Sequence, residues 1–144
     1  MPVPRYTEAM KTILAPLDFS AVTEAVVAEA AGLARAWKGR VVLLAVLEPP
    51  AITSEYAPLL ENIAEITAAG EKAAAKKLEA LAAKLAADGV PAETAQANGA
   101  PVAHIVERAT EVGADYIVMG SHGHTAIYDL LVGSTTHGVL MRAR

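Results

Sequence analysis

The residues Tyr116-Ile-Val-Met-Gly120-Ser-His-Gly123, followed after nine residues by Gly133-Ser-Thr135, decide the fold of this chain. Four apolar or aromatic residues ended by glycine are typical of a short strand buried on both faces, and the later glycines predict a loop before a helix. A connection from a strand through a loop to the start of a helix directs free backbone N–H groups and the positive end of the helix dipole at one place. Glycine lacks a Cβ, so an anion can approach its backbone closely. This stretch therefore predicts a phosphate-binding loop.

Three further strands are predicted upstream of this stretch. Residues 12–17 and 41–47 are short apolar runs, the second of them continuous, as in the middle of a parallel sheet. Residues 91–97 alternate small and polar side chains, and their alanines suit the edge of a sheet better than its centre. The first strand is followed by Asp18 and by Ser20, a candidate N-cap for the next helix.

Apolar residues at helical spacing predict three helices between these strands. Their buried stripes are, in chain order, Val26, Ala30, Leu33 and Trp37; Ala74, Leu78, Leu81 and Leu85; and Val102, Ile105, Val106, Ala109 and Val112. Each stripe is followed by a glycine at which the helix should stop, at Gly39, Gly89 and Gly113. Trp37 is expected in the core, while residues 48–67 fit either a surface loop or a frayed helix.

The alternation of strand and helix predicts an α/β fold with a doubly wound, open parallel sheet and right-handed crossovers. We expect one domain over residues 1–144. In such sheets, ligands bind outside the carboxyl ends of the strands, where the strand order reverses. Asp18 and the loop over residues 120–134 both follow such ends, and they should meet if the first and fourth strands are neighbours.

Composition narrows the range of functions. The chain has no cysteine, which excludes disulfides, thiolate metal sites and cysteine nucleophiles. Its formal net charge of -4 argues against a nucleic-acid or anionic-membrane partner. The longest apolar run, residues 41–47, is too short to span a bilayer, and the N-terminus has no apolar segment of signal-peptide type. We therefore expect a soluble, cytoplasmic protein.

The pattern Gly120-x-x-Gly123, nine residues, Gly133-Ser134, together with Pro16-Leu17-Asp18-Phe19-Ser20 after the first strand, resembles the universal stress protein family, and in particular its ATP-binding branch. The resemblance covers essentially the whole chain. It implies a Rossmann-like sheet of order 3-2-1-4-5, like that of the adenine nucleotide alpha hydrolases. Members usually continue into a fifth strand that often pairs across a dimer, whereas this sequence ends at Arg144, so a sheet without its fifth strand is expected.

The same resemblance assigns roles in a nucleotide site. It implies that the Asp18 side chain binds the ribose, that the Val46 backbone meets the adenine, and that Gly120 approaches the ribose. It further implies a base pocket and a phosphate site, the pocket lined by Pro16, Leu17 and Met119, and the phosphates surrounded by His122, Gly123, Gly133, Ser134 and Thr135. The expected ligand is ATP or another adenine nucleotide, with Mg²⁺ or Mn²⁺ held mainly through phosphate oxygens and water.

Other functional interpretations of these residues are weaker. His122 and His124 stand two residues apart with no cysteine and no evident third ligand, which is more typical of solvated loop residues than of a metal site. Protonated His122 would add positive charge near a triphosphate. His104, near the start of a helix, is expected to be structural or exposed.

No catalytic residue is assigned. No Gly-Lys-Ser or Gly-Lys-Thr follows any strand, and no lysine occurs after Lys84, so the chain has no P-loop. Neither paired carboxylates nor a Ser-His-Asp arrangement is evident, so no general base is identified for attack by water.

Three functions remain open at this point. The first is a nucleotide-dependent regulatory module of the stress response, a homodimer that presents a changed surface to an unidentified protein partner. The second is a slow Mg-dependent ATPase or phosphotransferase that uses the same pocket. The third is a dimeric interaction module that retains the fold without the nucleotide.

Overall fold

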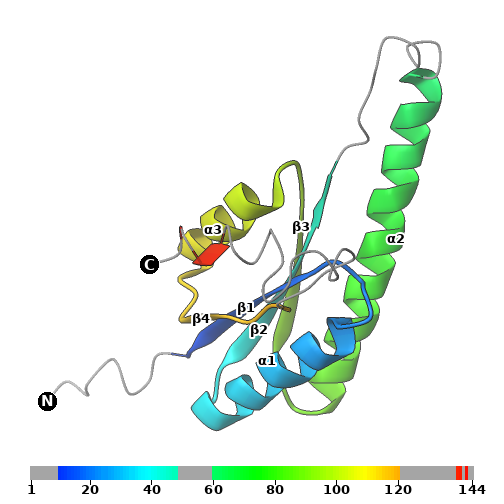
Figure 1. Cartoon of the computed structure of the whole chain (residues 1–144). Coiled ribbons are helices and arrows are strands. Elements are labelled where there is room, and N and C mark those ends of the chain that lie inside the picture. Colours follow the sequence, from blue (N-terminus) through cyan, green and yellow to red (C-terminus); the bar gives the residue numbers. More distant parts are fainter. Residues whose placement is uncertain (1–9, 49–59, 121–138, 141, 143–144) are drawn as a thin grey trace, which may run out of the picture.

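The computed structural model describes residues 10–48, 60–120, 139–140 and 142, and these form a parallel sheet flanked by helices (Figure 1). The elements are β1 (Thr12–Leu17), α1 (Thr23–Trp37), β2 (Arg40–Leu47), α2 (Leu60–Ala87), β3 (Ala92–Asn98), α3 (Pro101–Val112) and β4 (Tyr116–Ile117). The strand order is β3-β2-β1-β4, which confirms the predicted α/β sheet and the order 3-2-1-4 within it. No fifth strand occurs among the described residues.

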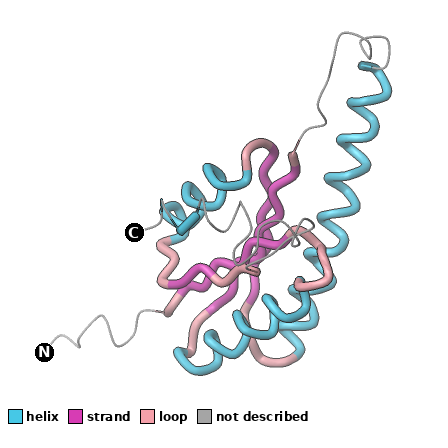
Figure 2. Tube along the Cα trace, viewed as in Figure 1, coloured by secondary structure: helices cyan, strands magenta, loops and turns pink. Residues whose placement is uncertain are grey.

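The helices cover both faces of the sheet (Figure 2). Ile13, Leu43 and their neighbours on one face of the strands form a buried cluster with α1 and α2. Leu14, Val42 and Leu44, on the other face, pack with Ile105 of α3. Because side chains alternate along a strand, the apolar runs of β1 and β2 supply both clusters at once.

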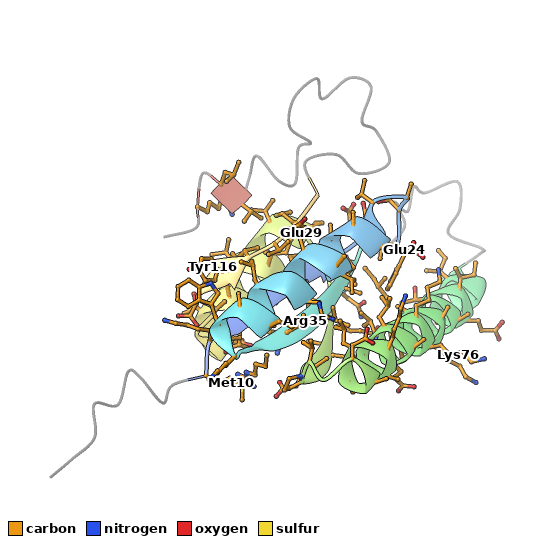
Figure 3. The ribbon with its side chains drawn as sticks, turned by 90° about the horizontal axis from the view of Figure 1, so that it is seen from below. Met10, Glu24, Glu29, Arg35, Lys76 and Tyr116 are labelled. Carbon is orange, nitrogen blue, oxygen red and sulfur yellow. The ribbon has the colours of Figure 1, made fainter. Side chains whose placement is uncertain are left out.

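Charged residues of α1 and α2 lie on the outer sides of this layered structure. Figure 3 shows Glu24, Glu29 and Arg35 on α1 and Lys76 on α2, all of them exposed. At the start of α2 the side chain of Ile66 is 63% exposed, and in Figure 1 this end of the helix extends beyond the sheet. Within the described residues, no helix combines the length and the apolar composition that crossing a bilayer requires.

β3 is an edge strand, as its composition predicts. Its side chains are exposed or only partly buried. The Asn98 side-chain amide donates a hydrogen bond of 3.0 Å to Glu71 of α2, so polar contacts supplement the few apolar ones here. The ambiguous segment 48–67 is helical from Leu60 onward, which confirms the helical alternative for that part, while residues 49–59 lie outside the described residues.

Two predictions about α1 are wrong. Trp37 is 52% exposed rather than buried. It is the last helical residue, one turn beyond the buried Ala34, because helical spacing fixes the angle of a side chain around the axis but not whether anything packs over that turn. Ser20 is not the N-cap either: the cap is Val22, and no side chain caps this helix.

The fourth strand is less buried than its sequence predicts. β4 covers only Tyr116 and Ile117, and the Tyr116 side chain, labelled in Figure 3, is 42% exposed. Pairing nevertheless continues, because Val118 N donates to Leu14 O at 2.9 Å. The strand lies at one end of the described sheet, so it lacks the second neighbour that the interpretation as a fully buried strand assumed.

A polar cluster joins the amino ends of the strands. Asp115 N donates to Thr12 O, and Asp115 Oδ2 accepts from Thr12 N, both at 2.8 Å. Arg40 Nε donates to Thr12 Oγ1 at 3.1 Å, and its guanidinium pairs with Glu93 at 2.6 Å. Residues at the starts of all four strands are therefore linked from edge to edge.

We expect Asp115→Ala to lower the free energy of unfolding by about 1–2 kcal/mol, because the N–H of Thr12, which is 4% exposed, loses its acceptor. Asp115→Asn is the matched control, since its amide oxygen can still accept that bond. Urea denaturation of both variants checks this. Equal losses in the two would show that the charge pair with Lys11, at 3.8 Å, matters more than the hydrogen bond.

Candidate functional site

The carboxyl ends of β1 and β4 lie side by side. The two strands pair in parallel, with Ile13 opposite Tyr116 and Leu14 opposite Ile117. If this register is continued beyond the paired residues of both strands, Leu17 lies opposite Gly120. The predicted adjacency of the first and fourth strands is therefore confirmed, and it brings the Asp18 turn next to Gly120, where the predicted glycine loop begins.

Three of the predicted base-pocket residues share one face of the sheet. Val46 and Met119 pack on the cluster beneath α3, and Pro16 follows Leu14 of that cluster by two residues in β1. All three are partly buried, so part of each side chain stays accessible. Together they form a mainly apolar wall at the carboxyl edge, which suits the flat face of a purine.

Leu17 differs from the other three. Its side chain is 6% exposed and belongs to the cluster on the opposite face, beneath α1 and α2. Any contact of Leu17 with a ligand on the α3 face must therefore use its backbone.

The backbone of Val46 points toward the end of β1. Arg40 N donates to Lys11 O on the β1 side of β2, whereas Leu47 O accepts from Gly99 N on the β3 side. In a parallel strand successive residues alternate between the two sides, so Val46 directs its N–H and C=O toward β1. The β1–β2 pairs end at Leu17 and Ala45, which places the Val46 carbonyl just beyond the paired part of β2, where a base edge could reach it.

Asp18 is exposed, and one of its carboxylate oxygens accepts a hydrogen bond within the turn. Its Oδ1 accepts from Ser20 N at 2.9 Å, a local turn contact that the sequence also allows. Its Oδ2 makes no hydrogen bond to any described residue and is left to accept one from a ligand. The turn-forming and the ligand-binding interpretations of Asp18 are therefore compatible.

The turn after Asp18 has features that sequence reasoning missed. Phe19 has φ 58°, a left-handed conformation that is uncommon for a bulky residue, and Lys77 of α2 lies 5.0 Å from the centre of its ring. The hydroxyl oxygens of Ser20 and Thr23 are buried without a hydrogen-bond partner among the described residues. No sequence pattern signals these contacts, because α2 and this turn meet only in the folded chain.

Five predicted site residues lie outside the described residues, namely His122, Gly123, Gly133, Ser134 and Thr135. Their assignment to the phosphates remains a prediction. Among the residues that the structure describes, no group of three or more His, Asp or Glu side chains is arranged to hold a metal ion.

A separate groove of about 700 Å³ lies between α3, β4 and residues 139, 140 and 142. Its lining is largely apolar and includes Val106, Ala109, Ile117 and Met119. Met119 is the one described residue that it shares with the predicted nucleotide site. The groove follows the flank of β4 rather than the carboxyl ends of β1 and β2.

Comparison with known proteins gives a consistent result. The model of the universal stress protein family matches residues 10–144. Universal stress protein YxiE of Bacillus subtilis is 40% identical over 77 residues, which are 54% of this chain and 52% of that protein, so this match spans about half the length of the relative. Universal stress protein MJ0577 of Methanocaldococcus jannaschii is 28% identical over 145 residues, which cover 92% of this chain and 90% of that protein.

Solved structures extend the likeness to three dimensions. The MJ0577 structure has a TM-score of 0.78 at 29% identity and covers 93% of this chain and 90% of its own. A universal stress protein in complex with cAMP has a TM-score of 0.64 at 26% identity and covers 94% of this chain and 92% of its own. The strand order and the family model agree: this chain belongs to the universal stress protein family.

Proposed function

We propose that this chain is a nucleotide-dependent regulatory module that binds ATP at the carboxyl ends of β1, β2 and β4. The observation that carries the proposal is the meeting of the Asp18 turn with Gly120 at the point where the strand order reverses. The cAMP complex of a relative supports an adenine nucleotide as the ligand class.

The described residues fit such a ligand. The wall of Pro16, Val46 and Met119 would take one face of the base, and the Val46 backbone would take its polar edge. The free Asp18 Oδ2 would accept a hydrogen bond from a ribose hydroxyl. Phosphates would extend from Gly120 toward the glycine-bearing stretch that is predicted to form a loop, with Mg²⁺ or Mn²⁺ held mainly by phosphate oxygens and water.

Asp18→Asn should weaken ATP binding by about tenfold or more, since a charge-assisted hydrogen bond to the ribose is lost. The asparagine oxygen can still accept from Ser20 N, so the turn is kept and the loss reports on the ligand alone. Calorimetric titration of MgATP into both proteins measures the effect. An unchanged dissociation constant for MgATP would show that the Asp18 side chain does not bind the nucleotide.

Two other functions are distinguished on the same samples. Release of phosphate from bound ATP at a steady rate would favour a slow ATPase or phosphotransferase. If the folded wild-type chain binds no adenine nucleotide, a nucleotide-independent interaction module remains. Family membership also leads us to propose a cytoplasmic homodimer that acts in a stress response through a protein partner, and light scattering tests the dimer.

A further inference from the structure

The imidazole of His104 lies across the backbone of Gly99. A Cβ built on Gly99 would lie 2.7 Å from His104 Nε2 and 3.2 Å from its Cδ2, so the ring occupies the space that a side chain would need. His104 is in the first turn of α3, where Cβ atoms tilt toward the helix N-terminus and so toward Gly99. Gly99 itself has φ 136°, which favours glycine.

This contact places His104 at the carboxyl edge of the sheet. Gly99 N donates to Leu47 O at 2.9 Å, and Leu47 follows Val46 in β2. Val102, also in the first turn of α3, packs in the cluster that includes Val46 and Met119. The first turn of α3 therefore lies over the same face of the sheet as the apolar wall, and the ring, against Gly99, lies near the end of β2 to which the base is assigned.

The ring also has unused hydrogen-bonding capacity. His104 is partly buried, and no hydrogen bond or ion pair joins its imidazole to another described residue. A structural histidine on a helix face usually has a partner for at least one ring nitrogen. A ring that packs against Gly99 and has no hydrogen bond from either nitrogen to a described residue is suited to contact a ligand.

We infer that His104 covers the outer face of the nucleotide base and so determines base affinity, an inference that rests on the proposed ATP site. A purine at this edge of the sheet would meet Pro16, Val46 and Met119 on one face only. A flat ring opposite that wall would stack on the other face, and stacking of a base on an aromatic side chain contributes substantially to nucleotide binding. α3 thereby becomes part of the site through its first turn.

Histidine NMR tests the contact directly. The chain has four histidines, and the signals missing from His104→Gln identify the ring of His104. We expect these signals to move upfield when MgATP is added to the wild-type protein, because of the ring current of a stacked purine. Ribose 5-triphosphate with Mg²⁺, which lacks the base, should leave them in place.

Affinity gives the second readout. His104→Ala should raise the dissociation constant for ATP about fivefold or more, and His104→Phe, which keeps a flat ring, should restore most of the affinity. Arg108→Ala is the control, one turn farther along α3, where Arg108 pairs with Glu111 at 3.3 Å, and it should bind as wild type does.

The outcomes separate this inference from the proposal on which it rests. Wild-type binding of ATP with no shift of the His104 signals and no loss in His104→Ala would reject the role of His104 and keep the nucleotide site. A loss in His104→Ala that His104→Phe does not restore, with no ring-current shift, would equally reject stacking. Absence of any ATP binding by the wild type would overturn both.

Discussion

Leu43→Ala is expected to lower the free energy of unfolding by about 3 kcal/mol, within the range of 2–5 kcal/mol for buried leucine truncations. Leu43 is fully buried in β2, which has a neighbouring strand on each side. Its side chain lies in the cluster that joins the sheet to α1 and α2, so the cavity left by truncation would be enclosed on the side of both helices. Rigid surroundings of this kind cannot collapse to fill the space.

Leu81→Ala is the matched control for this effect. Leu81 packs against the same cluster from α2 but is only partly buried, so solvent and neighbouring side chains can fill the space that it leaves. Chemical denaturation of both variants should show a clearly smaller loss for Leu81→Ala. Losses of equal size would mean that the core is not centred on β2.

Gly39→Ala is expected to destabilise the fold by about 2 kcal/mol, because its new Cβ has no space. That atom would overlap the backbone carbonyl oxygen of Lys11. The same oxygen accepts the hydrogen bond from Arg40 N at 2.8 Å, so moving it away would break the contact at which β1 and β2 begin to pair. Unlike the end of a flexible side chain, a backbone carbonyl in a paired strand cannot yield at low cost.

Gly32→Ala, in the preceding helix, is expected to change the stability in the opposite direction. Gly32 lies inside α1 with nothing within 4 Å of its Cβ position, and alanine there should stabilise the protein by up to about 1 kcal/mol through its higher helix propensity. Thermal unfolding of the two variants, recorded by circular dichroism, should show melting temperatures that move in opposite directions. A neutral Gly39→Ala would show that β1 and β2 can separate at this point without cost.

Gly39 illustrates how far local sequence reasoning extends. Its position after the first apolar stripe correctly predicts the end of α1, but the left-handed residue at the cap is Lys38, with φ 52°. The structure requires glycine at the next position for a different reason, the close approach of the Lys11 backbone. A contact with a residue so distant along the chain leaves no periodic signal. By contrast, Gly113 is itself the left-handed cap of α3, as predicted.

The sequence alone determined the alternation of strands and helices and the edge position of β3. It also placed Asp18 and Gly120 after the ends of strands, because apolar periodicity and glycine placement are local properties. Tertiary structure decided what depends on distant neighbours. Only the folded chain shows that Trp37 is exposed and that His104 packs against Gly99. It also shows that the Leu17 side chain lies on the opposite face of the sheet from Pro16, Val46 and Met119. The physical reason is that periodicity encodes the direction of a side chain around its own element, whereas the residue that it meets is set by which elements pack together.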